Sequence, residues 1–245
     1  MASFAPDGQT FVATSGTGNL VVRSTSDTHI ITQLATSSDG WAAQPDVAPG
    51  GHAIAYVTQP TAMKFDELFL NQTSVVVQSY DPATMTTGVS RVLDAANGDQ
   101  SSYYPAWSPD GEWIAFNRNS NNQETYDAST ATLWVTRGDG SAQPIELNLA
   151  NAVGELKNSW MRWAPFEQTI GSNHEPMWWL TFSSQRDFGV RSVGLSQRQI
   201  WMTPFFPLRA AAGLDPSGPA FRLPFQDLGT DNHLAQWTTK VIPIQ

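Results

Sequence analysis

The chain has 245 residues, of which 40% are apolar and 11% aromatic, enough to build a sizeable hydrophobic core. Its formal charge of -9 repels nucleic-acid phosphates and anionic lipid head groups, so nucleic acid is not an expected partner. The absence of cysteine excludes disulfides, thiolate metal sites and cysteine nucleophiles. No apolar run approaches the roughly 18 residues of a membrane helix, so membrane insertion is not expected.

A turn followed by an apolar run recurs along the chain. Its shared prolines, Pro6, Pro49, Pro109 and Pro165, are separated by 43, 60 and 56 residues. A unit of about 40 residues with insertions of variable length has the size of one propeller blade. We therefore take the sequence as a series of similar units.

Each unit contains short β-type runs divided by Gly, Pro, Asp and Asn, without the 3.6-residue period of an amphipathic helix. In each unit, two further β-type runs come after the turn and the apolar run that follows it. In chain order these pairs of runs are 20–23 and 30–34, 75–78 and 91–93, 133–136 and 144–147, and 200–203 and 221–223. The runs "AIAYV" (53–57) and "EWIAF" (112–116) are nearly continuous in apolar residues. We predict that these two are inner strands covered on both faces by neighbouring blades.

The stretch "WSPDGEWIAF" (107–116), followed by "LWVTRGDGSAQPIEL" (133–147), resembles the Pro-Asp repeat of TolB-type propellers, a WD-like family. The resemblance implies an all-β fold, a β-propeller of four-stranded antiparallel blades. Within a single region, 1–245, the predicted blades are 1–40, 41–98, 99–152 and 153–228. The last residues, 229–245, are predicted to supply the inner strand of a further or closing blade.

Four units and a fragment are fewer than the six or seven blades usual for this resemblance. An unclosed propeller exposes strand edges at both ends, which proteins normally cover. The chain is then part of a longer protein, or another chain caps its edges, or the C-terminal strand closes a small ring by joining the first blade. We favour the first two.

The turn residues have a structural interpretation, because Pro presets φ, Asp bonds nearby backbone amides and Gly accepts the left-handed conformation. A catalytic aspartate would not recur on separate blades. The predicted structural turn residues are Pro6, Asp7, Gly8, Pro49, Gly50, Pro109, Asp110 and Gly111.

Large rings are predicted to form the blade core. They are Trp107, Trp113, Phe116, Trp134, Trp163, Trp179, Trp201 and Trp237.

The irregular insertions, 58–73, 117–130, 166–176 and 185–198, are the candidate recognition loops. The first contains a predicted interaction cluster that either docks another chain or packs over its own blade. Its residues are Met63, Phe65, Leu68 and Phe69. In the second, Glu124 and Asp127 stand among amide oxygens, which are hard ligands suited to calcium. The alternative there is a solvated loop, and no other cofactor is expected.

The sequence contains no nucleophile elbow, phosphate loop or dinucleotide fingerprint. We therefore predict a non-catalytic protein-binding or scaffold propeller, a subunit or part of a larger assembly, whose partners are other protein chains. Few lysines and many Ser, Thr, Asn and Gln favour a periplasmic or extracellular bacterial protein. The alternative is a propeller hydrolase or lyase acting on a polysaccharide or peptide, or the accessory propeller of such an enzyme. In that alternative His52, His174 and His233 face the central channel, with or without a metal.

Overall fold

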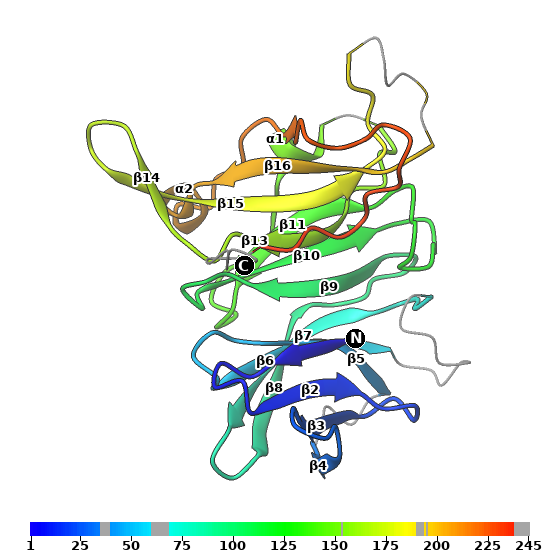
Figure 1. Ribbon diagram of the computed structural model, residues 1–245, viewed down its shortest axis with the longest axis vertical. Coiled ribbons are helices and arrows are strands. Elements are labelled where there is room, and N and C mark those ends of the chain that lie inside the picture. The colour runs from blue at the N-terminus through cyan, green and yellow to red at the C-terminus, as the bar shows by residue number, and fades with distance from the viewer. Residues whose placement is uncertain (35–39, 60–68, 153, 190–193, 195, 238–245) are drawn as a thin grey trace, which may run out of the picture.

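The computed structural model describes residues 1–34, 40–59, 69–152, 154–189, 194 and 196–237, and its regular structure is almost entirely β (Figure 1). The strands form four antiparallel sheets, each built from one continuous region of the chain. The predicted all-β propeller of four-stranded antiparallel blades is therefore confirmed. Two short helices, α1 (Asn148–Asn151) and α2 (Pro207–Ala211), lie in connections. Within the described ranges no helix has the length and apolar character needed to cross a bilayer.

Each blade begins with its inner strand and continues outward. Blade 1 contains β1 (Ala2–Phe4), β2 (Thr10–Thr14), β3 (Leu20–Ser24) and β4 (Ile30–Gln33). Blade 2 contains β5 (Trp41–Val47), β6 (Ala53–Gln59), β7 (Ser74–Asp81) and β8 (Thr86–Asp94). Blade 3 contains β9 (Ser101–Trp107), β10 (Trp113–Asn119), β11 (Thr132–Arg137) and β12 (Ile145–Glu146). Blade 4 contains β13 (Ser159–Trp163), β15 (Glu175–Ser184), β16 (Gln199–Phe205) and β17 (Phe221–Arg222), with β14 (Gln168–Ile170) paired to β15.

The prediction of which strands are innermost was wrong for two segments. "AIAYV" lies in β6 and most of "EWIAF" lies in β10, and each is the second strand of its blade. The inner strands are β5 and β9, which precede the turns and line a central cavity. The second strands are still buried on both faces, because neighbouring blades cover each sheet.

Consecutive blades are joined by apolar clusters. Val12 and Ile54 belong to a cluster between blades 1 and 2, and Val57 and Phe116 to one between blades 2 and 3. Between blades 3 and 4, other aromatic rings form a third cluster. The cluster between blades 2 and 3 also includes Trp160 of the blade 4 inner strand, and Met1 packs against it near the axis. Figure 1 shows blades 1 and 2 in the lower half of the molecule and blades 3 and 4 in the upper half. The blades form an open stack with two end faces.

Three inner strands carry a bulge at the same distance before the shared proline. Gln44, Tyr104 and Trp160 have φ values of 53°, 53° and 58°, and strand register shifts at each of them. A bulge removes a backbone group from the ladder, so its amide needs another acceptor. Gln44 Oε1 accepts the Tyr104 N–H at 2.9 Å, and Asn117 Oδ1 accepts the Trp160 N–H at 3.2 Å. Side chains of one blade thus satisfy the inner strand of the next.

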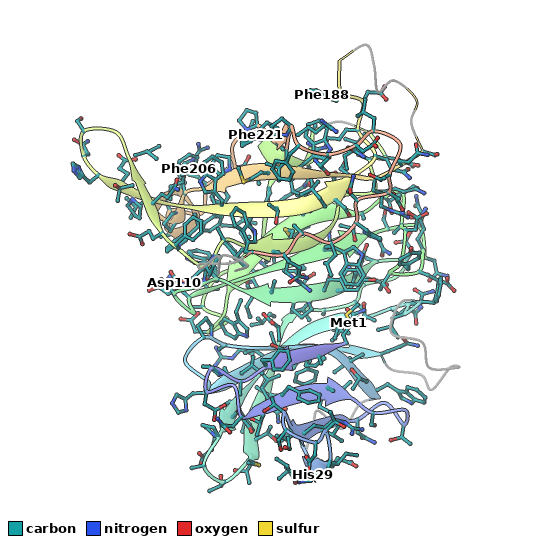
Figure 2. The ribbon with its side chains drawn as sticks, viewed as in Figure 1. Met1, His29, Asp110, Phe188, Phe206 and Phe221 are labelled. Carbon is teal, nitrogen blue, oxygen red and sulfur yellow. The ribbon has the colours of Figure 1, made fainter. Side chains whose placement is uncertain are left out.

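The repeated turns are closed by their own side chains. Asp7 Oδ1 accepts the Gln9 N–H at 2.9 Å, and Asp110 Oδ1 accepts the Glu112 N–H at 3.0 Å. Ser108 donates its hydroxyl to Asp110 and accepts the N–H of the residue that begins β10. Asp110 is exposed at the edge of the molecule (Figure 2). In these turns the polar side chains hold the hairpin.

In the turns of blades 1, 2 and 3, the left-handed residue is the glycine two positions after the proline. Gly8, Gly51 and Gly111 have φ values of 69°, 75° and 72°, so in blade 2 the residue Gly50 takes the place of the aspartate. Replacing Gly51 by alanine is expected to lower the free energy of unfolding by about 1 to 2 kcal/mol, because a Cβ is disfavoured in this conformation. Urea titration followed by circular dichroism measures the loss.

The neighbouring variant Gly50→Ala is the matched control. Gly50 lies outside the left-handed region, and an added Cβ would meet no atom within 4 Å. We expect its free energy of unfolding to stay within about 0.5 kcal/mol of the parent protein or to rise slightly. An equal loss in both variants would contradict this account of the turn.

Candidate functional site

The inner strands of all four blades surround a cavity of about 580 Å³. Two residues beyond the described strands, Leu234 and Gln236, line one side of it. The remaining lining residues are Met1, Ala2, Ser3, Phe4, Gln44, Pro45, Asp46, Tyr104, Pro105, Trp160 and Arg162. This cavity occupies the centre of the propeller.

Four residues stand at equivalent positions of the inner strands, each three residues before a shared proline. They are Ser3, Asp46, Ala106 and Arg162, one from each blade. Sequence reasoning did not single out this position, although the proline spacing that defined the repeat also aligns it. Asp46 and Arg162 carry opposite charges, and Ala106 is apolar. The position therefore does not hold the same kind of side chain in each blade, as a repeated core position would.

Asp46 links three blades. Its carboxylate accepts the hydroxyl of Ser3 at 3.0 Å and the backbone N–H of Trp107 at 2.7 Å. Burial raises the pKa of Asp46, and the Trp107 N–H, the charge of Arg162 and the Ser3 hydroxyl partly oppose that rise. Burial likewise lowers the pKa of Arg162, against the attraction of Asp46. The centre therefore holds two charged groups that are poorly solvated.

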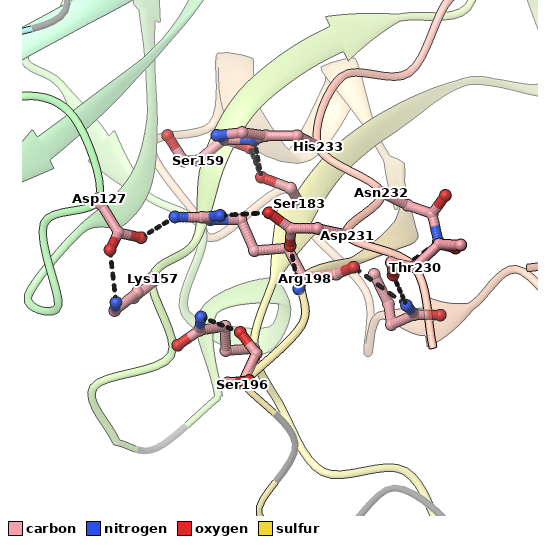
Figure 3. A network of polar contacts seen from close by, with 12 residues as sticks. Asp127, Lys157, Ser159, Ser183, Ser196, Arg198, Thr230, Asp231, Asn232 and His233 are labelled. Atoms are coloured by element: carbon pink, nitrogen blue, oxygen red, sulfur yellow. Dashed lines mark hydrogen bonds and ion pairs between the residues drawn. The ribbon is translucent and has the colours of Figure 1, made fainter. Parts of the chain in front are cut away.

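A second polar site clamps residues 229–237, here called the C-terminal segment, to blades 3 and 4 (Figure 3). Arg198 forms ion pairs with Asp127 and with Asp231, the latter at 2.6 Å, and Lys157 pairs with Asp127 at 2.6 Å. Burial alone would raise the pKa of Asp127, but hydrogen bonds and charges from Lys157 and Arg198 outweigh it and lower the pKa. The clamp joins four separate parts of the chain.

The C-terminal segment continues over blade 4 beside a serine and histidine pair. Ser183 Oγ lies 3.2 Å from His233 Nδ1 and donates to the Ser159 carbonyl at 3.3 Å. Burial and the charge of Arg198 lower the pKa of His233, so its imidazole is neutral at pH 7. Ser183 has no exposed surface, so a substrate cannot reach its hydroxyl. This pair fixes the segment and does not form a nucleophilic site.

An apolar groove of about 470 Å³ lies between the C-terminal segment and the outer face of blade 4. We call "outer face" the side turned away from blade 3. Ile200 lines the groove, whereas its neighbour Trp201 packs toward blade 3, because successive residues of a strand face opposite sides. The lining residues are Thr181, Ile200, Met202, Leu223, Phe225, Ala235, Gln236 and Trp237. Phe225 is 80% exposed at this groove.

The residues predicted to fill the blade core divide into two groups. Trp107, Trp113, Phe116, Trp163 and Trp201 are buried. The others are partly exposed. Trp134 lies against the guanidinium of Arg118, and Trp179 lies on the outer side of blade 4. Trp237 donates its ring N–H to Thr181 at 3.0 Å.

The predicted interaction cluster is described only in part. Met63, Phe65 and Leu68 lie outside the described residues. Phe69 is 46% exposed, and its ring centroid lies 5.6 Å from that of Tyr126. This cluster stays a prediction.

Glu124 and Asp127, the residues predicted to bind calcium, lie in surroundings that differ from that prediction. Glu124 is exposed, whereas the carboxylate of Asp127 faces the cationic groups of Lys157 and Arg198. Two cations at one carboxylate disfavour a third. Across the described residues, His, Asp and Glu side chains nowhere gather in a group of three able to hold a metal ion.

The three histidines of the enzyme alternative lie on different parts of the chain. His52 follows the turn of blade 2, His174 lies at the end of the β14 hairpin and His233 belongs to the C-terminal segment. The first two are exposed. None of the three lines the central cavity.

No protein family and no characterised protein matches the chain by sequence. Solved structures do match it by fold. A chain of hydrazine synthase from Kuenenia stuttgartiensis aligns with a TM-score of 0.51 at 13% identity, over 94% of this chain and 55% of that one. The fold is a β-propeller. The chain thus spans about half the length of the hydrazine synthase chain.

Other matches include a TolB from Agrobacterium tumefaciens, with a TM-score of 0.36 at 16% identity over 90% of this chain and 78% of that one. An oligogalacturonate lyase in complex with manganese matches with a TM-score of 0.48 at 11% identity, over 91% of this chain and 52% of that one. The structures that match thus include TolB proteins, the family that the sequence resembles. Identities this low carry no information about activity.

The clamp predicts a pH-dependent loss of stability. Arg198→Met removes the cation shared by Asp127 and Asp231, and we expect the free energy of unfolding to fall by about 2 kcal/mol at pH 7. The lowered pKa of Asp127 makes its contribution complete above the ordinary value of 3.8, and that contribution disappears as pH falls through the native value. The stabilities of variant and parent should therefore converge at a pH below 3.8.

Urea titrations at neutral and acid pH measure both effects. The control Arg209→Met changes an exposed arginine of α2 and should alter stability by less than about 0.5 kcal/mol. A loss for Arg198→Met that is the same at both pH values would contradict the role given to Asp127.

Proposed function

We propose that the protein is a non-catalytic β-propeller that binds another protein chain through the outer face of blade 4. The observation that carries this proposal is the apolar groove beside Phe225, whose ring is 80% exposed. Phe221 of β17 is 41% exposed, and Figure 2 shows it at the blade 4 end of the molecule. Contiguous exposed apolar groups of this kind are typical of protein-binding surfaces.

The stacking of the blades supports the choice of this face. Blades 1, 2 and 3 each have one face covered by the next blade. Blade 4 has the same alternation of side chains between its two faces, but in the described residues no fifth sheet covers its outer face. The C-terminal segment covers only part of it, through Trp237 and His233. We infer that the occupant is an apolar strand or sheet surface of another protein, which continues the stack.

Charge and composition indicate where this binding occurs. A formal charge of -9 favours a partner whose interface rim is basic, because complementary potentials speed association. Few lysines and many uncharged polar residues support a location in the periplasm or outside the cell. The protein would act there as a scaffold subunit of a larger assembly.

No specific geometry in the described residues favours the hydrolase or lyase alternative. The hydroxyl of Ser183 is buried, and the nearby imidazole has no carboxylate at its other nitrogen, since His233 Nε2 lacks a hydrogen-bond partner there. A nucleophilic site needs an accessible nucleophile and an oriented base. The binding function is therefore the one that the geometry supports best.

Site-specific photocrosslinking tests the proposal. A photoreactive phenylalanine analogue is placed at position 225 in the full chain, which is then produced and irradiated in the source cells. The matched control carries the analogue at position 89, because Val89 is 90% exposed on β8 of blade 2. We expect a covalent product of higher mass, containing a second protein, from position 225 only.

Substitution completes the test. Phe225→Asp should lower the yield of the crosslinked product from a neighbouring probe at position 221 by at least tenfold, without a change in the melting temperature. Crosslinking that is equal from positions 225 and 89, or absent from 225, would rule out this face as the binding surface.

A further inference from the structure

Arg162 in the central cavity has hydrogen-bonding capacity that the protein does not use. A guanidinium carries five N–H donors. Among the described residues its one acceptor is the Met161 carbonyl, 3.0 Å from Nη1. Arg162 is only partly buried and lines the cavity, so its remaining donors are open to a molecule that enters. A guanidinium fork of this kind matches the two oxygens of a carboxylate.

The groups around Arg162 restrict the charge of such a molecule. Asp46 shares the cavity, and its carboxylate is already committed to Ser3 and Trp107. One negative charge added near Arg162 is compensated by the guanidinium. Asp46 repels any anion here, and it repels a phosphate dianion more strongly than a monoanion, because the dianion carries twice the charge into a poorly solvated centre. The site therefore favours a ligand with a single negative charge.

The rest of the wall suits a carbon skeleton. The rings of Tyr104 and Trp160 are stacked, with centroids 4.0 Å apart and an angle of 22° between their planes. Phe4 and Leu234 also line the cavity and are 67% and 42% exposed. Such aromatic and apolar walls with a few placed polar groups are typical of small-molecule sites. A volume of about 580 Å³ admits a small organic molecule.

We propose that the central cavity is a binding site for a small organic monocarboxylate, whose carboxylate is held by Arg162 and whose apolar body lies against Tyr104, Phe4 and Leu234. Gln236 lines both this cavity and the groove on blade 4, whereas Arg162, Tyr104, Phe4 and Leu234 line the cavity alone. It gives the propeller a ligand that enters at its axis, where all four blades meet.

Isothermal titration calorimetry of the full chain tests the proposal with acetate, benzoate and 3-phenylpropionate as probes. We expect saturable binding of at least one aromatic carboxylate, and at least tenfold weaker binding of benzamide, which has the same ring without the charge. Inorganic phosphate should bind at least tenfold more weakly than that carboxylate. Binding of none of the three carboxylates, or equal binding of benzamide or phosphate, would overturn the proposal.

Two variants locate the site. Arg162→Gln should weaken carboxylate binding at least tenfold, and Arg162→Lys should weaken it less, because the charge remains but the planar fork is lost. Arg209→Gln, at an exposed position of α2, should bind like the parent. Circular dichroism checks that each variant is folded. Unchanged affinity in both Arg162 variants would place the carboxylate elsewhere and refute this site.

Discussion

The structure depends on burying both faces of each blade. In β7, the neighbouring residues Val76 and Val77 point to opposite sides, one into the cluster shared with blade 1 and the other into the cluster shared with blade 3. A single sheet cannot cover either face by itself, so blades must stack. The same constraint leaves the two ends of the stack incomplete. At blade 4, the C-terminal segment covers part of the face through side-chain hydrogen bonds, without strand pairing in the described residues.

The centre of the propeller follows a different principle, because the inner strands meet there without pairing to one another. Their bulged amides are satisfied by side chains of the preceding blade, such as Gln44 and Asn117. Asp46 extends the pattern by binding the Trp107 amide across the blade boundary. Polar side chains therefore hold adjacent blades in register around the axis, and Arg162, which has few such bonds, is left available to a ligand. Apolar packing thus holds the faces of neighbouring blades together, and side-chain hydrogen bonds hold the inner strands at the centre.

The blade fold could be predicted from the sequence because it depends on local patterns, the Pro-Asp-Gly turns and the apolar runs beside them. The order of strands within a blade was predicted less well, since an apolar run indicates burial on two faces but not which partner lies at the axis. The charged centre was missed because Asp46 and Arg162 belong to blades 2 and 4 and approach only when the blades stack. Asp127 was predicted to bind calcium for a similar reason: its cationic partner Arg198 is distant in sequence.

Hydrogen–deuterium exchange on the native assembly tests most directly whether blade 4 carries the binding face. The tagged protein is isolated from its source cells with its partners, and exchange is compared with that of the purified chain alone. The account predicts slower exchange in the assembly for amides 223–236, along the groove and the C-terminal segment, and unchanged exchange in β8 of blade 2. Protection confined to blades 1 and 2, or no difference along 223–236, would contradict it.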